Sequence, residues 1–313
     1  MHTLRSYFRG VAALTLVALP LLATPVAEAR RRPDGELVFR TRRAADLGGG
    51  RVARLRTALA MQPEQSGAWL ELPDDVVLPV HQGSSLSATI AEGHGALLVA
   101  VALEGQGGRS RFFAHRVDPT AAPAALGRAH DITRPSAPPG TPFGVAATAT
   151  PDGFTVFFQE LDASDQSLAR TFMVQLAPDG SPRGPSVEVP VPWGVSAATW
   201  NGAGYHLALN YPSGEGVRLS MVSVDPSGRP QQHPDWASAA GTVMDVHLVA
   251  EGGRVLAYFR GGATGQDLLE ADVTRIRQWG QEPPAPRRVS RLDWDQLIVV
   301  TRGPDGARAR AVR

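Results

Sequence analysis

A glycine placed directly before an apolar run recurs along this 313-residue chain at nearly regular spacing. The intervals between these glycines are 60, 58, 51 and 49 residues, and the glycines are Gly35, Gly95, Gly153, Gly204 and Gly253. A sixth apolar run begins at Asp295 without a glycine. The runs are strand-length, and no helical period is sustained after residue 29. Repeats of this kind predict similar supersecondary units, each packed on its neighbours.

A second marker, a turn built on proline and glycine, stays in phase with the first. One copy is Ala177-Pro178-Asp179-Gly180, and Asp225-Pro226-Ser227-Gly228 follows 48 residues later. Proline presets the backbone at the second position of a tight turn, and glycine supplies positive φ near its end. Each unit therefore reads as a meander of short antiparallel strands.

A third marker is a run of mostly small residues before the apolar strand in four successive units. These runs cover residues 85–90, 144–150, 194–200 and 242–249. A segment of Ala, Ser, Thr and Gly has weak β-propensity, so it is expected to form a strand only where the fold favours small side chains. A narrow central axis on which several sheets converge favours small residues, because bulky side chains on both faces would not fit there. The small-residue run is therefore predicted to be the innermost strand, the glycine to form the turn after it, and the apolar run to be the next strand outward.

These repeats resemble those of the β-propeller superfamily, in the loosely conforming form found in secreted bacterial propellers. The resemblance covers roughly residues 35–313 and implies an all-β propeller. We favour six blades, with five as the alternative, closed by strands from both termini. The Gly-His and Trp-Asp pattern of WD40 repeats is absent. A pair of β-sandwiches is the rival fold, and the helix-like composition of residues 51–62 is interpreted as a strand from its phase.

The first 29 residues read as a secretory signal peptide, with Arg5 and Arg9 before an apolar stretch and Ala27-Glu28-Ala29 as the cleavage pattern. An uncleaved membrane anchor is the alternative. We therefore expect residues 30–313 to form one propeller domain that is secreted or periplasmic, with no membrane span after signal removal. The chain has no Cys, so disulfides and thiolate metal sites are excluded.

Charge is distributed unevenly along the chain. Removal of the signal leaves 29 arginines and 29 acidic residues, so the mature chain has no net charge and nucleic acid is not an expected partner. Both ends of the mature chain are rich in arginine, and ring closure would bring them together. Arg40, Arg42 and Arg43 are therefore candidates for binding an acidic partner.

The residues with the clearest chemical potential are Asp245 and His247, which are two apart in a predicted innermost strand. On a regular strand they share one face, so a carboxylate would orient an imidazole toward the axis. Hydrogen bonding to neighbouring blades or to water is the alternative role. Trp193 and Trp236 lie near unit boundaries and are candidate sugar-binding residues on the rim.

No catalytic, phosphate-binding or metal-binding motif occurs, and no cofactor or metal is expected. The sequence therefore predicts a non-catalytic, monomeric binding scaffold whose ligand is a protein or a glycan. One alternative is a propeller hydrolase or lyase with a channel site around Asp245 and His247. The other is an assembly component of the cell envelope.

Overall fold

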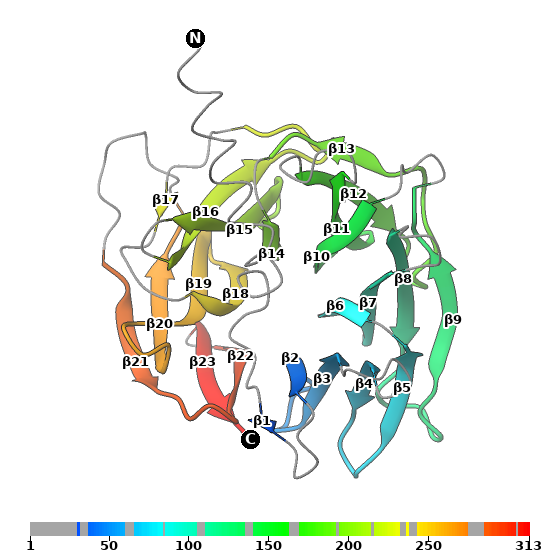
Figure 1. The fold of residues 1–313 in the computed structure, drawn as a ribbon, viewed down its shortest axis with the longest axis horizontal. Coiled ribbons are helices and arrows are strands. Elements are labelled where there is room, and N and C mark those ends of the chain that lie inside the picture. Colours follow the sequence, from blue (N-terminus) through cyan, green and yellow to red (C-terminus); the bar gives the residue numbers. More distant parts are fainter. Residues whose placement is uncertain are drawn as a thin grey trace.

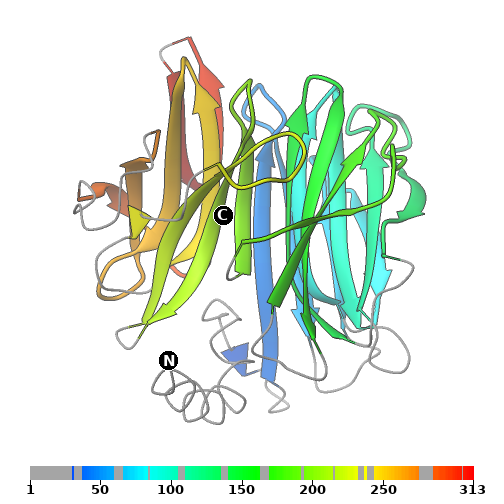
Figure 2. The ribbon, with the colours of Figure 1, turned by 90° about the horizontal axis from the view of Figure 1, so that it is seen from above.

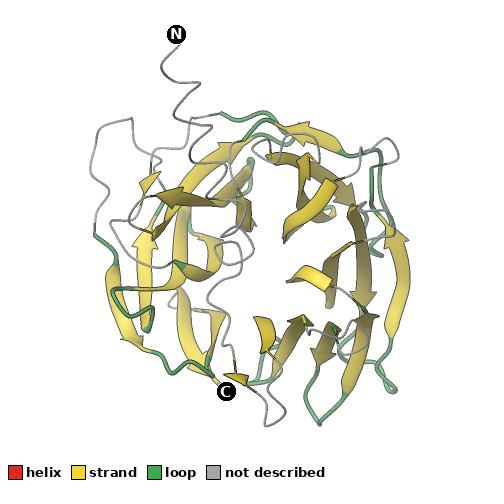
Figure 3. Ribbon diagram, in the orientation of Figure 1, coloured by secondary structure: helices red, strands yellow, loops and turns green. Residues whose placement is uncertain are grey.

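The computed structural model describes residues 30–31, 37–59, 66–83, 85–104, 110–134, 140–162, 169–191, 194–213, 216–231, 236–237, 243–274, 285–304 and 306–313. The elements assigned in these residues are all β-strands (Figure 3). Among them we find no helix with the length and apolar character needed to cross a membrane. The predicted signal peptide, residues 1–29, lies outside this part of the chain.

The first three sheets each contain consecutive strands that pair antiparallel in chain order. Blade one contains β1 (Arg30–Arg31), β2 (Leu37–Asp46), β3 (Val52–Leu59), β4 (Gly67–Glu71) and β5 (Val77–Gln82). Blade two contains β6 (Ser85–Gly93), β7 (Ala96–Glu104), β8 (Ser110–Val117) and β9 (Leu126–Asp131). Blade three contains β10 (Gly140–Thr150), β11 (Gly153–Asp162), β12 (Ala169–Leu176) and β13 (Val187–Val189).

Two more sheets repeat this pattern, and a shorter one ends the chain. Blade four contains β14 (Gly194–Trp200), β15 (Tyr205–Ser213), β16 (Gly216–Val224) and β17 (Trp236–Ala237). Blade five contains β18 (Met244–Glu251), β19 (Arg254–Gly261), β20 (Asp267–Asp272) and β21 (Arg287–Arg291). The C-terminal hairpin contains β22 (Leu297–Gly303) and β23 (Gly306–Val312).

The sheets stand around a common axis as a ring (Figures 1 and 2), which confirms the predicted all-β propeller. Five of them are complete blades, and the C-terminal hairpin occupies a sixth sector with two strands. The described residues thus form six strand repeats around the axis but five full blades. The predicted numbers, six and five, correspond to these two ways of counting.

The small-residue runs supply innermost strands, as predicted. Residues 85–90, 144–150, 194–200 and 242–249 coincide with or overlap β6, β10, β14 and β18, whose residues line a cavity on the axis. Two other strands were predicted in the wrong position. The runs after Gly35 and at Asp295 are innermost strands, β2 and β22, rather than second strands. Residues 52–59 form β3, so the strand interpretation of this stretch is confirmed.

The glycine breaks form the predicted turns between first and second strands. Gly95 has φ +66° and Gly253 has φ +75°, a region that side chains with a Cβ rarely adopt. A Cβ on Gly153 would lie 2.1 Å from the carbonyl oxygen of Leu176, so no larger residue fits there. In the Pro/Gly turns, the N–H of Gly180 donates to Ala177 and that of Gly228 donates to Asp225.

Apolar side chains fill the space between each pair of consecutive sheets, so the core is a ring of separate clusters. The cluster between blades two and three is rich in aromatic residues: Phe112, Phe158 and Phe172 are buried, with ring centroids 4.4 Å and 5.7 Å apart. The ring closes between the C-terminal hairpin and blade one, where Leu297 and Val299 pack against β2 and β3. Strands from both ends therefore close the ring, as predicted, but they pack face to face and do not share a sheet.

Candidate functional site

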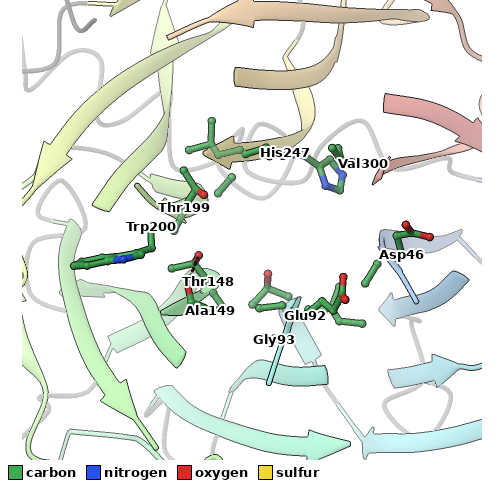
Figure 4. Close-up of a pocket in the computed structure, with 18 of the residues that line it drawn as sticks. Asp46, Glu92, Gly93, Thr148, Ala149, Thr199, Trp200, His247 and Val300 are labelled. Atoms are coloured by element: carbon green, nitrogen blue, oxygen red, sulfur yellow. Dashed lines mark hydrogen bonds between the residues drawn. The ribbon is translucent and has the colours of Figure 1, made fainter. Parts of the chain in front are cut away.

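The six innermost strands enclose a cavity of about 700 Å³ on the axis of the ring. Its lining extends from Arg43, Ser196 and Val246 to the ends of the strands at Asp46, Glu92 and Trp200. Small residues make up much of this wall, which leaves space for the few larger polar side chains. The cavity gathers side chains from all five blades and from the C-terminal hairpin (Figure 4).

Two carboxylates line the cavity where neighbouring strands end. Asp46 is the last residue of β2, and Glu92 lies next to the last residue of β6 (Figure 4). Burial raises the pKa of the Glu92 carboxyl, and the negative charge of Asp46 raises it further. The positive charge of Arg302, on β22, lowers the pKa of Glu92 and opposes these two effects. Glu92 is therefore the cavity carboxyl that holds its proton to higher pH than an ordinary glutamate.

Arg43 lies at the inner end of the described cavity and links three blades. Its Nη1 donates to the carbonyl oxygen of Val246 and its Nη2 to that of Ser196, each at 3.2 Å. Burial lowers the pKa of the guanidinium, while the nearby Asp245 carboxylate raises it. Arg43 thus bridges β2 to β14 and β18 across the axis.

His247 lines the same cavity from β18. Burial lowers the pKa of its imidazole to about 3, and the positive charge of Arg43 contributes to this shift. The ring is therefore neutral at physiological pH. In that form it can donate one hydrogen bond and accept another, but it brings no charge to the cavity.

Asp245, the predicted partner of His247, does not line the cavity. The ladder between β18 and β19 is irregular between Met244 and His247, and Asp245 has φ +51°. This bulge breaks the strict alternation on which the shared-face prediction depended. The Asp245 carboxylate instead accepts a hydrogen bond from Arg260 Nε at 3.3 Å.

The predicted binding residues are dispersed. Arg43 points into the protein interior, where its donors bond to backbone, and not onto an outer docking surface. Arg40 and Arg42 lie on β2 opposite Ala58 and Arg56. Trp236 lies on β17, opposite Met221. Trp193 lies outside the described residues.

Sequence reasoning missed Asp46, Glu92 and Arg302, although a signal was present. Each lies at or near the end of an innermost strand, just before a turn that contains glycine. A search for the last charged residue of each unit's first strand would have selected them. Among the described residues, no cluster of three or more His, Asp or Glu is arranged to hold a metal ion.

No family model and no curated protein matches the chain. Among solved structures, the chain is similar to an α-L-arabinofuranosidase from Lactobacillus brevis, with TM-score 0.45 and 12% identity over 81% of this chain and 88% of that one. An exo-1,5-α-L-arabinanase from a bovine ruminal metagenomic library has a TM-score of 0.43 and 9% identity over 88% of this chain and 97% of that one. A putative oxidoreductase (glucose dehydrogenase) from Thermus thermophilus has a TM-score of 0.47 and 14% identity over 86% of this chain and 92% of that one.

The prediction of a non-catalytic binding scaffold is corrected at this point. It rested on the absence of a catalytic constellation in the sequence, but the fold brings Asp46, Glu92 and His247 to one cavity. The catalytic alternative, a hydrolase or lyase with a channel site, agrees better with the arrangement of these side chains.

Proposed function

We propose that the axial cavity is the active site of a hydrolase that cleaves a glycosidic bond. The observation that carries the proposal is the pair of carboxylates, Asp46 and Glu92, on adjacent innermost strands, with the pKa of Glu92 raised. Glycoside hydrolysis generally uses two carboxyl groups, one protonated and one ionised, on either side of the bond that breaks. Environments that separate the two pKa values assign the acid and the base.

In this mechanism the protonated Glu92 donates its proton to the glycosidic oxygen as the carbon–oxygen bond breaks. The Asp46 carboxylate stabilises the positive charge that develops on the sugar ring. One water molecule then adds its hydroxyl group to the sugar, and the remaining proton of that water passes to Glu92 and restores the acid. The positive charge of Arg302 stabilises the Glu92 carboxylate after its proton has left. Threonine hydroxyls at positions 89, 148 and 199 line the wall and are suited to bind sugar hydroxyl groups.

The test is hydrolysis of a panel of aryl pentosides and hexosides by the purified protein. We expect Glu92→Gln and Asp46→Asn each to lower kcat by about 100-fold or more, because each removes one member of the pair. Asp152→Asn is the matched control, since Asp152 is an exposed carboxylate on the turn between β10 and β11. Thermal unfolding of every variant checks that the fold is retained.

The pH profile gives a second test of the same roles. Activity should fall as pH rises through the raised pKa of Glu92, because the acid then loses its proton. This alkaline limb should disappear from the residual activity of Glu92→Gln. A wild-type protein inactive on the whole panel, or a Glu92→Gln variant with full activity, would contradict the proposal.

A further inference from the structure

The C-terminal hairpin is the incomplete member of the ring. The other sheets have four or five strands, whereas β22 pairs with β23 and the described residues add no third strand. β23 is therefore an edge strand, with one row of backbone groups turned away from its partner. The same position in each complete blade is covered by a third and a fourth strand.

The contacts of Ala307 show which residues of β23 face this edge. Its N–H donates to the Glu251 carboxylate, and its carbonyl oxygen accepts a hydrogen bond from the Tyr258 hydroxyl at 3.0 Å. Because side chains of blade five use both backbone groups, Ala307 faces away from β22. Backbone direction alternates along an antiparallel strand, so Ala309 and Ala311 face outward as well.

Two hollows flank this edge, one on each side of the hairpin. The hollow toward blade five measures about 410 Å³, and its apolar wall includes Leu256, Tyr258 and Val289. The hollow toward blade one measures about 530 Å³ and is lined by Arg51, Arg54, Arg310 and Arg313. They lie where the outer strands of a complete sixth blade would pack against its two neighbours.

The two hollows differ in chemistry. On the blade five side, Arg254 and Arg287 pair with Asp272 and Glu270, so their charges are largely balanced. On the blade one side the lining includes four arginines and no Asp or Glu, and of these arginines Arg313 pairs with Asp293 and Asp295 outside the lining. Arg51 and Arg310 are exposed there. Alternate side chains of an added strand would therefore meet an apolar wall and a basic wall.

We propose that the outer edge of β23 binds an extended acidic segment of a partner protein as a third strand. Backbone groups of Ala309 and Ala311 would pair with the segment, in the manner of peptides that extend a sheet. The segment would alternate apolar residues, facing blade five, with Asp or Glu, facing Arg51 and Arg310. The positive charge on that face is what selects an acidic partner.

The test uses the full chain and a fluorescent peptide that alternates valine and glutamate. We expect saturable binding that weakens with added salt, since the arginine contacts are exposed. Hydrogen exchange supplies an independent readout. The amides of Ala309 and Ala311 should exchange readily in the free protein and become protected when the peptide is bound.

Variants separate the backbone and charge contributions. Ala309→Pro removes an outward N–H and should abolish binding, while proline is tolerated on an edge strand. Arg310→Glu should weaken binding at least about tenfold. Arg128→Glu, the same charge reversal at an exposed position on β9, is the matched control and should leave binding unchanged. A peptide with lysine in place of glutamate should not bind.

Three outcomes would overturn the proposal. One is the absence of binding by the glutamate peptide at low salt. Another is equal binding by the wild type, Ala309→Pro and Arg310→Glu. The third is strong protection of the Ala309 and Ala311 amides in the free protein, which would show that the chain itself or a second copy already covers the edge.

Discussion

The interface between blades two and three and the interface that closes the ring are filled by different side chains. The first contains Phe112, Phe158 and Phe172, all almost fully buried. The second contains small aliphatic residues, with Leu297 and Val299 of β22 facing blade one. A phenylalanine buries far more area than a valine, so the closing interface has less hydrophobic stabilisation than the first.

Polar contacts reinforce the ring near its closure. Arg43 bridges β2 to β14 and β18, and Arg54 donates to the carbonyl oxygen of Arg313. Tyr258 and Glu251 hold the backbone of Ala307. The comparison indicates that apolar burial dominates one side of the ring, while hydrogen bonds to backbone supplement a smaller core on the other.

The largest effect is expected at the aromatic interface. Phe158→Ala should lower the free energy of unfolding by about 4 kcal/mol, because it leaves a cavity between two aromatic neighbours. Urea denaturation followed by tryptophan fluorescence measures this change. Phe158→Leu is the control, with a clearly smaller loss. Equal losses for the two variants would show that ring packing contributes little here.

A pH effect is expected on the polar side. The unfolded chain protonates His247 near pH 6.5, but the folded chain resists protonation until about pH 3. The contribution of neutral His247 to the free energy of unfolding is therefore greatest above pH 6.5. It decreases as pH falls, by about 3 kcal/mol at pH 4.5. His247→Gln should flatten this part of the stability curve. An unchanged slope in His247→Gln would contradict the assignment.

A matched pair of valines tests the comparison directly. Val156, between blades two and three, and Val299, at the closure, are both fully buried. Truncation to Ala should destabilise the protein by about 2 kcal/mol at Val156 and by about 1 kcal/mol at Val299, where small neighbours can close the gap. Denaturant titration gives both values. A greater loss at Val299 would reverse the ranking of the two interfaces.

The smallest effect concerns the tether of the C-terminal hairpin. Tyr258→Phe removes one hydrogen bond to Ala307 and should lower stability by about 1 kcal/mol, with faster amide exchange along β23. Tyr205→Phe is the control, because its hydroxyl pairs with Thr155 in the interface between blades three and four. That variant should leave exchange in β23 unchanged.

The fold could be predicted because its determinants are local. Glycines such as Gly95 and Gly253 supply backbone angles that their turns require, and small residues indicate a crowded axis. The site could not be predicted in the same way. Asp46 and Glu92 belong to different repeats, and their proximity depends on how blade one packs beside blade two.

The two predicted polar candidates show a second limit. A two-residue spacing places Asp245 and His247 on one face only if the strand is regular, and the bulge is not visible in the residue types. Arg43 was predicted to face an acidic partner because it belongs to a basic segment. Its actual partners are backbone carbonyl groups of blades four and five, which no local pattern reveals.

Arg43 also limits how far a linear molecule could pass along the axis of the ring. Its bonded guanidinium stands at the inner end of the described cavity, so a chain entering from the Glu92 side meets an obstacle after a short distance. Threading through the ring is thereby hindered. A molecule that entered from that side would then have to leave by the same side.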